Sequence, residues 1–88
     1  MSTRAPTLLL LRSRDADRIR EALRAALGLT LRGRPVRIYS EIEIGRAELP
    51  SDGQRHMSTL DALGVQVRPL RELKATQLAA AHAVEVWS

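Results

Sequence analysis

The stretch Thr7-Leu8-Leu9-Leu10-Leu11 decides the fold, because this apolar run is too short for a helix of ordinary length. A strand that is apolar at nearly every position is typical of a parallel sheet covered by helices on both faces. Ser13 and Asp15 follow, and their side chains can accept amide hydrogens at the start of a helix. We therefore predict a central strand over residues 7–11, followed directly by a helix.

That helix is predicted over residues 16–32, because apolar residues recur there with helical spacing and Gly33 can take the left-handed conformation that ends a helix. Asp17, Glu21 and Arg24 lie on the opposite face at spacings of four and three. The apolar positions form one stripe expected to pack on the sheet: Ile19, Leu23, Ala26, Leu27 and Leu31.

Residues 36–44 alternate between apolar and polar side chains, which predicts a second strand with one wet face. A loop over residues 45–53 precedes a second helix, which we expect to begin at Asp52 or Gly53 and to end at Gly64. Its buried stripe is predicted to contain His56, Met57, Leu60 and Leu63.

The last quarter of the chain predicts two further strands around a helical segment. Residues 65–68 form a short third strand that stops before Pro69. Residues 70–81 have helical spacing, with a break expected near Thr76, and residues 83–87 alternate as a fourth strand.

Strands that alternate with helices through short connections predict parallel pairing by right-handed crossovers. The whole chain, residues 1–88, is predicted to be one α/β domain of three layers with a four-stranded parallel sheet. The first strand is the most apolar, and the second and fourth carry charges at alternate positions. This distribution favours the sheet order 2-1-3-4.

Composition limits both stability and chemistry. The chain has 88 residues, no cysteine and only two aromatic residues, Tyr39 and Trp87, so its core is thin and has no disulfide. Thiol chemistry is excluded, no metal-binding cluster is recognisable, and no cofactor is expected. Association with a second copy is the remaining source of stability, so we expect a homo-oligomer.

The predicted second strand is longer than its neighbours, and its far end is therefore expected to meet another subunit. Ser40, Ile42 and Ile44 lie in this part, over residues 40–45. An apolar strand end is a surface that proteins normally cover. The alternative is a loop whose alternation is accidental.

The net charge of +4 is spread over the chain, with basic residues interspersed among ten acids. The sequence has no stretch of the roughly 20 apolar residues that a membrane span needs, and no leader pattern. We expect a soluble, cytoplasmic protein without membrane contact.

Several segments together resemble the DsrE/DsrF-like family of sulfur-relay proteins. The resemblance follows the hydrophobic pattern of strand, alanine-leucine helix, glycine turn and strand, and it covers nearly the whole chain. The segments are Leu8-Leu9-Leu10-Leu11, Ala22-Leu23, Ala25-Ala26-Leu27-Gly28-Leu29, Gly33-Arg34-Pro35-Val36-Arg37-Ile38, Leu60-Asp61-Ala62-Leu63-Gly64-Val65-Gln66-Val67 and Ala80-Ala81-His82-Ala83-Val84-Glu85-Val86-Trp87.

The resemblance implies a flavodoxin-like sheet, assembly into oligomers and, in several family members, sulfur relay through a cysteine persulfide after the third strand. Here that region is Arg68-Pro69-Leu70-Arg71. Because a persulfide needs a thiolate sulfur, this chain cannot act as such a carrier.

Ser13 and Arg14 are the candidate ligand-binding residues, at the carboxyl end of the first strand, where helix amides can hold an anion. The alternative, which we favour, is that Ser13 and Asp15 only cap the helix. His56 and His82 could act as bases near neutral pH, but neither has a local partner, so structural roles are favoured.

Two carboxylates, Glu41 and Glu43, are expected to face the same way on the second strand. A metal is one interpretation, but a solvated strand edge is the ordinary one, and no third ligand is evident.

Our hypothesis is a non-catalytic, oligomeric DsrE-like protein that binds a protein partner or a small ligand. No catalytic constellation supports an enzyme. The alternative is a basic nucleic-acid-binding module, which is less favoured because aromatic residues and known binding motifs are absent. That module would use Arg4, Arg12, Arg14, Arg34 and Arg37.

Overall fold

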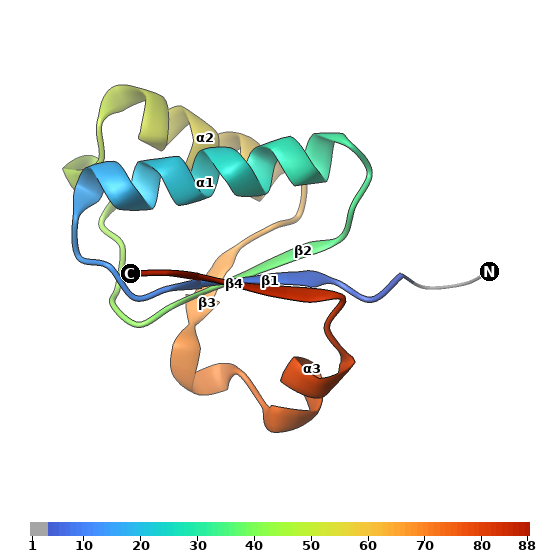
Figure 1. Cartoon of the computed structure of the whole chain (residues 1–88). Helices are drawn as coiled ribbons and strands as arrows, with labels where there is room; N and C mark the ends of the chain where they lie inside the picture. The colour runs from blue at the N-terminus through green and yellow to red at the C-terminus, as the bar shows by residue number, and fades with distance from the viewer. Residues whose placement is uncertain (1–3) are drawn as a thin grey trace.

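A computed structural model describes residues 4–88 as one α/β unit with a four-stranded parallel sheet (Figure 1). The strands are β1 (Thr7–Leu11), β2 (Val36–Ser40), β3 (Val67–Pro69) and β4 (Ala83–Trp87). The helices are α1 (Ala16–Leu31), α2 (Ser51–Ala62) and α3 (Ala75–Ala80), with short 3₁₀ turns η1 (Arg46–Glu48) and η2 (Leu70–Glu72).

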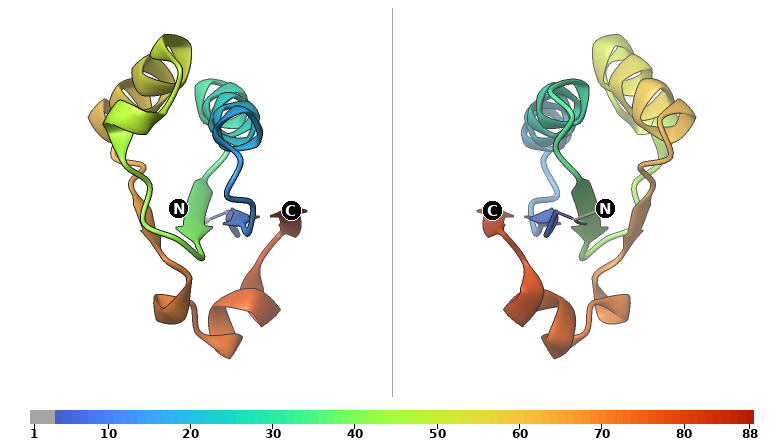
Figure 2. Two further views of the ribbon diagram at one scale, coloured as in Figure 1. Left: turned by 90° about the vertical axis from the view of Figure 1, so that its left-hand side faces the viewer. Right: turned by 90° about the vertical axis from the view of Figure 1, so that its right-hand side faces the viewer.

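The elements form three layers, as predicted and as in a small flavodoxin-like domain. Helices α1 and α2 lie side by side on one face of the sheet, and the η2–α3 segment lies on the other (Figures 1 and 2). Asp15 caps α1, because its side chain accepts the amide hydrogens of Asp17 and Arg18.

The strand order is β3-β2-β1-β4, so the predicted order 2-1-3-4 is wrong. β2 is a central strand that pairs with both β1 and β3. Its residues Val36, Ile38, Tyr39 and Ser40 are therefore buried. The edge predicted for the second strand belongs instead to β3, which has three residues and ends in a proline. β4, whose residues are mostly exposed, forms the other edge, as predicted.

The second strand is shorter than predicted, because Ser40 turns the chain. Its hydroxyl donates to the carbonyl of Ile42 at 2.6 Å and accepts from the amide of Ile42 at 3.3 Å. These bonds replace a continued strand. Glu41 and Glu43 therefore lie in a loop, and the expectation of a strand over residues 36–44 is wrong beyond Ser40.

The later boundaries also differ from the predictions. Val65 does not belong to β3, because its amide donates to the carbonyl of Leu60 at 2.8 Å and so closes the end of α2. Helix α2 begins at Ser51, one residue before the expected start. The segment after β3 breaks at residues 73–74 rather than near Thr76.

The main core lies between the sheet and the two long helices. It contains the buried side chains of Leu9, Leu11, Ile19, Leu23 and Leu60. Leu31, placed by its spacing in the same stripe, is instead 67% exposed. A helix of 16 residues is about 24 Å long and a strand of five only about 17 Å, so α1 is longer than the strands that it covers.

The opposite face of the sheet is less evenly covered. Leu8 and Tyr39 are buried there, but Val84 and Val86 of β4 are 42% and 53% exposed. The η2–α3 segment lies on this face of the sheet (Figure 2), and it leaves these two valines of β4 exposed.

Candidate functional site

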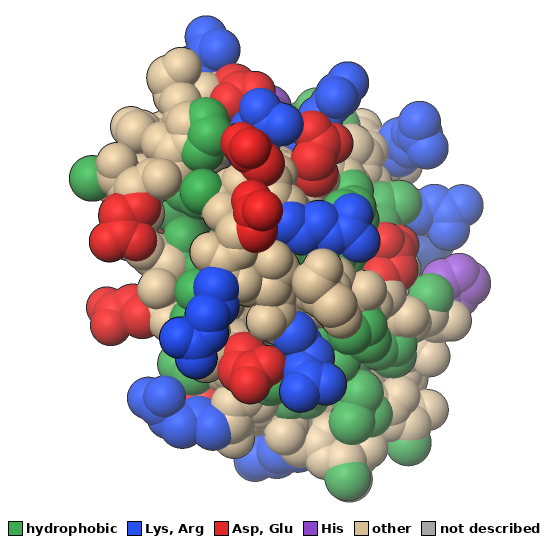
Figure 3. Space-filling model, turned by 60° about the vertical axis from the view of Figure 1, so that its left-hand side comes forward, with side chains coloured by type: hydrophobic (Ala, Val, Ile, Leu, Met, Phe, Trp, Pro, Cys, Tyr) green, Lys and Arg blue, Asp and Glu red, His purple; other side chains and the backbone are tan. Residues whose placement is uncertain are grey.

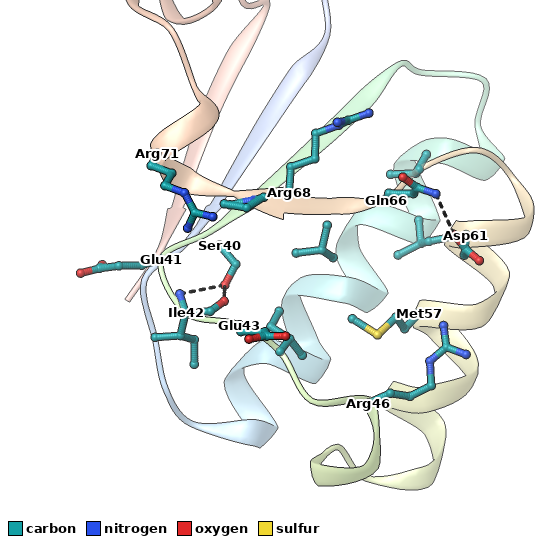
Figure 4. Close-up of a pocket in the computed structure, with 15 residues that line it drawn as sticks. Ser40, Glu41, Ile42, Glu43, Arg46, Met57, Asp61, Gln66, Arg68 and Arg71 are labelled. Atoms are coloured by element: carbon teal, nitrogen blue, oxygen red, sulfur yellow. Dashed lines mark hydrogen bonds between the residues drawn. The ribbon is translucent and has the colours of Figure 1, made fainter.

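A groove of about 550 Å³ runs along β3, from Val65 and Gln66 before the strand to Arg71 after it, and reaches the carboxyl end of β2 (Figure 4). It is bounded by residues 41–46, by α2 and by β3. Its lining is mixed: the apolar part includes Ile42, Ile44, Met57, Leu60, Val65 and Val67, and polar and charged residues form the rest. Open α/β sheets usually bind ligands at the carboxyl ends of the strands beside the switch point of the strand order, which in this sheet lies between β1 and β4 and not at this groove.

The groove exists because α2 packs mainly on α1 rather than on β3. Gly53 permits this close approach, since a Cβ atom at that position would lie 3.2 Å from Cγ of Arg20. Arg20 also contacts Asp52, with 3.8 Å between Nη1 and Oδ2. With α2 held against α1, the space between α2 and β3 stays open.

Charged groups form part of the groove lining. Arg46 and Arg71 line the groove, and neither forms an ion pair among residues 4–88. Arg46 lies beside Met57 on the α2 side, and Arg71 points from η2 toward Ser40 (Figure 4). These two guanidinium groups are available to an anion.

The acidic groups of the groove are mostly engaged. The Glu41 carboxylate accepts from Nε of Arg12 at 3.0 Å, and Oδ1 of Asp61 accepts from Nε2 of Gln66 at 3.4 Å. Glu43 alone has no hydrogen bond or ion pair within the described part of the chain. Among residues 4–88, the charged lining residues without an ion pair are therefore Arg46, Arg68 and Arg71, against Glu43 and Asp61.

Arg68 also lies beside the groove but extends away from it (Figure 4). It pairs in register with Tyr39, whereas Val67 pairs with Ile38 of the core. Because side chains alternate along a strand, Arg68 belongs to the opposite face of the sheet from Val67.

The predicted anion-binding residues, Ser13 and Arg14, lie at the carboxyl end of β1. With the observed strand order this is the switch point between β1 and β4. The first free amides of α1 bond to Asp15, and the Ser13 hydroxyl accepts from the amide of Asp15 at 3.0 Å. The capping role is confirmed for Asp15, whereas Ser13 bonds only to the cap residue, and anion binding at Ser13 and Arg14 stays a prediction.

The switch point is also filled by the end of β4. The carbonyl of Trp87 accepts from the amides of Arg12 and Ser13 at 2.8 and 3.1 Å. The guanidinium of Arg18 lies 4.5 Å from the centre of the Trp87 ring, which is a cation–π contact.

The residues predicted to form a subunit contact line the groove instead of projecting from a long strand. Ser40 is buried, and Ile42 and Ile44 are half-buried against the core. The prediction assumed a strand that continues to residue 44, and this assumption is wrong because β2 ends at Ser40. Whether these residues also meet another subunit stays a prediction.

The other candidates are dispersed. His56 is half-buried on α2, and His82 is exposed between α3 and β4, with its amide donating to the carbonyl of Pro6. Glu41 bonds to Arg12, whereas Glu43 faces the groove (Figure 4). Among residues 4–88, no three histidine or acidic side chains gather in a way that could hold a metal ion.

The arginines of the nucleic-acid alternative lie at both ends of the sheet. Arg12 and Arg14 follow β1 at the carboxyl edge, whereas Arg34 precedes β2 at the amino edge. Figure 3, which looks toward the carboxyl ends, shows acidic and basic side chains intermixed on that face.

Sequence reasoning missed Arg46 and Arg71. With β2 and β3 placed as neighbours, the residues after their carboxyl ends converge on one edge, and that rule would have identified Arg71 and Glu43 together. No helix among the described residues is long and apolar enough to span a membrane. Comparison with family models, curated proteins and solved structures gave no match, so no relative assigns this chain to a family.

Proposed function

We propose that this protein is a non-catalytic binding protein whose groove takes a small ligand with an apolar body and a carboxylate or phosphate group. One observation carries the proposal. The groove combines apolar side chains with Arg46 and Arg71, two arginines that face it and have no ion pair within residues 4–88.

The size and chemistry of the groove support this ligand class. Small-molecule sites usually enclose about 300–1,000 Å³ and combine apolar walls with a few polar groups. The groove, at about 550 Å³, lies within that range. Guanidinium groups favour carboxylate and phosphate, because their planar forks form bidentate hydrogen bonds with these anions.

The wider hypothesis is a DsrE-like protein of the cytoplasm that works as an oligomer and carries no sulfur. Its support is the parallel three-layer fold and the lack of cysteine. Binding at the groove requires no reacting group from the protein, which agrees with a role in holding a ligand or presenting it to a partner.

The test uses octanoate and octyl phosphate as probes, with inorganic phosphate and octanol as the separate halves of the ligand. Amide shifts in ¹⁵N-labelled protein would locate binding, and titration would give Kd. We expect the two amphipathic anions to shift amides of residues 42–46 and 65–71, and each half alone to bind more weakly.

The matched variants are Arg46→Gln, Arg71→Gln and Arg14→Gln. A hydrogen bond to a charged group contributes about 1.5–3 kcal/mol, so each groove variant should weaken octyl phosphate binding about tenfold or more. Arg14→Gln, at the switch point, should leave Kd unchanged. If neither anion shifts the groove amides, or if only Arg14→Gln weakens binding, the proposed site is wrong.

A further inference from the structure

The outer edge of β4 has no neighbour within the described part of the chain. β4 pairs only with β1, and Figure 2 shows no helix beside it on the outer side of the sheet. Val84 and Val86 are exposed on this strand. A long strand edge with exposed valines is a surface that proteins normally pair or block.

The backbone groups of the same two valines point outward. The carbonyl of Trp87 accepts from the amides of Arg12 and Ser13, so Trp87 directs its backbone groups toward β1. Successive residues of a strand direct their backbone groups to opposite sides. Val84 and Val86 therefore present their N–H and C=O groups at the free edge.

Beside this edge, on the α1 face, lies a second groove of about 420 Å³ between α1 and β4. Arg24 and Arg32 of α1 line it together with Glu85 and Trp87 of β4. None of Arg24, Arg32 and Glu85 forms an ion pair among residues 4–88. Unpaired charges of both signs thus flank the free edge.

We propose that two copies of this chain pair through β4, antiparallel about a two-fold axis at Glu85, and join their sheets into one. In this register Val84 lies opposite Val86 of the second copy. The outward N–H and C=O groups of these residues then bond to each other, and the valine side chains cover each other on the α3 face.

The charges beside the edge fit the same arrangement. The two-fold axis brings the Glu85 carboxylates of both copies together on the α1 face, where like charges alone would oppose pairing. Arg24 and Arg32 of both copies flank that position and supply the compensating positive charge. The edge is therefore complementary to itself in backbone, apolar contact and charge, which is what a two-fold contact requires.

This interface is independent of the ligand groove, because β3 and β4 are opposite edges of the sheet. Dimer formation and ligand binding are consequently measured on separate variants. A failure of one proposal leaves the other standing.

The test is the solution mass of the full chain at tens of micromolar, by sedimentation equilibrium. We expect the wild type to be a dimer. Val84→Lys/Val86→Lys should be monomeric, because four ammonium groups would meet at the joined edge. Val84→Thr/Val86→Thr, which keeps the branched shape, should remain a dimer.

Val86→Pro provides a second disruption, since it removes an outward N–H without removing a bond to β1. Hydrogen exchange would locate the contact between the two copies. The amides of Val84 and Val86 should be protected from exchange in the wild type and should exchange fast in the lysine variant. Circular dichroism would show that each variant is folded. A monomeric wild type, or a folded lysine variant that remains a dimer, would overturn the proposal.

Discussion

At the scale of single residues, Leu23 and Leu31 show how position along α1 decides what a leucine contributes. Both belong to the same predicted stripe, but Leu23 is fully buried and Leu31 is 67% exposed. We predict that Leu23→Ala lowers the free energy of unfolding by about 2–5 kcal/mol, through lost burial and a residual cavity. Urea unfolding followed by circular dichroism would measure it.

Leu31→Ala is the matched control on the same helix. An exposed site without special contacts changes stability by about 0.5 kcal/mol at most. If both variants lost the same free energy of unfolding, Leu31 would have to be covered in solution, either by another part of the chain or by another molecule.

At the scale of elements, one glycine inside α1 and one just after it have opposite conformational requirements. Gly28 lies inside the helix, and a Cβ there would meet nothing within 4 Å. Gly33 follows the helix with a φ of +79°. We predict that Gly28→Ala stabilises the protein by about 0.5–1 kcal/mol, whereas Gly33→Ala destabilises it by about 1–2 kcal/mol. Thermal unfolding of both variants would measure the two signs.

Gly64 gives an independent check, because it follows α2 with a φ of +83° and also has open space around its Cβ position. Gly64→Ala should behave as Gly33→Ala does. A neutral result at both turns would show that the left-handed conformations are not required.

Elements with a strong local pattern were predictable from the sequence, and long-range choices were not. β1, β4 and α1 appear within one residue of their predicted bounds, because apolar runs, caps and the turn at Gly33 are local signals. The end of β2 depended on one hydroxyl, that of Ser40, which the alternation of residues 36–44 concealed. Counting Glu41 and Glu43 as strand residues then made β2 look like an edge.

The candidate site could not be predicted, because the predicted strand order was wrong and β2 and β3 were not placed as neighbours. Ser40, Ile42 and Ile44 were predicted to form a subunit contact, and the structure places all three on the groove. Arg71 comes from a distant part of the sequence and reaches the same groove only because β3 lies beside β2. No local pattern around Arg71 carries that information.

At the scale of the whole molecule, pairing of two sheets through β4 would link stability to concentration, because mass action favours the folded dimer. We predict that a hundredfold increase in chain concentration raises the Tm of the wild type by about 5–10 °C. The Tm of Val84→Lys/Val86→Lys should not change with concentration. Scanning calorimetry or circular dichroism at several concentrations would decide between these outcomes.

The pairing of β1 with β4 also has a consequence for synthesis on the ribosome. Thr7 pairs with Ala83, so the most apolar strand of the sheet waits for its second neighbour until nearly all of the described chain has emerged. Until then α1 and β2 can assemble on β1, but one side of this leucine-rich strand stays open. Unpaired strand edges of this kind make nascent chains prone to aggregate. Pairing of β4 with β1, late in synthesis, would remove this unpaired edge.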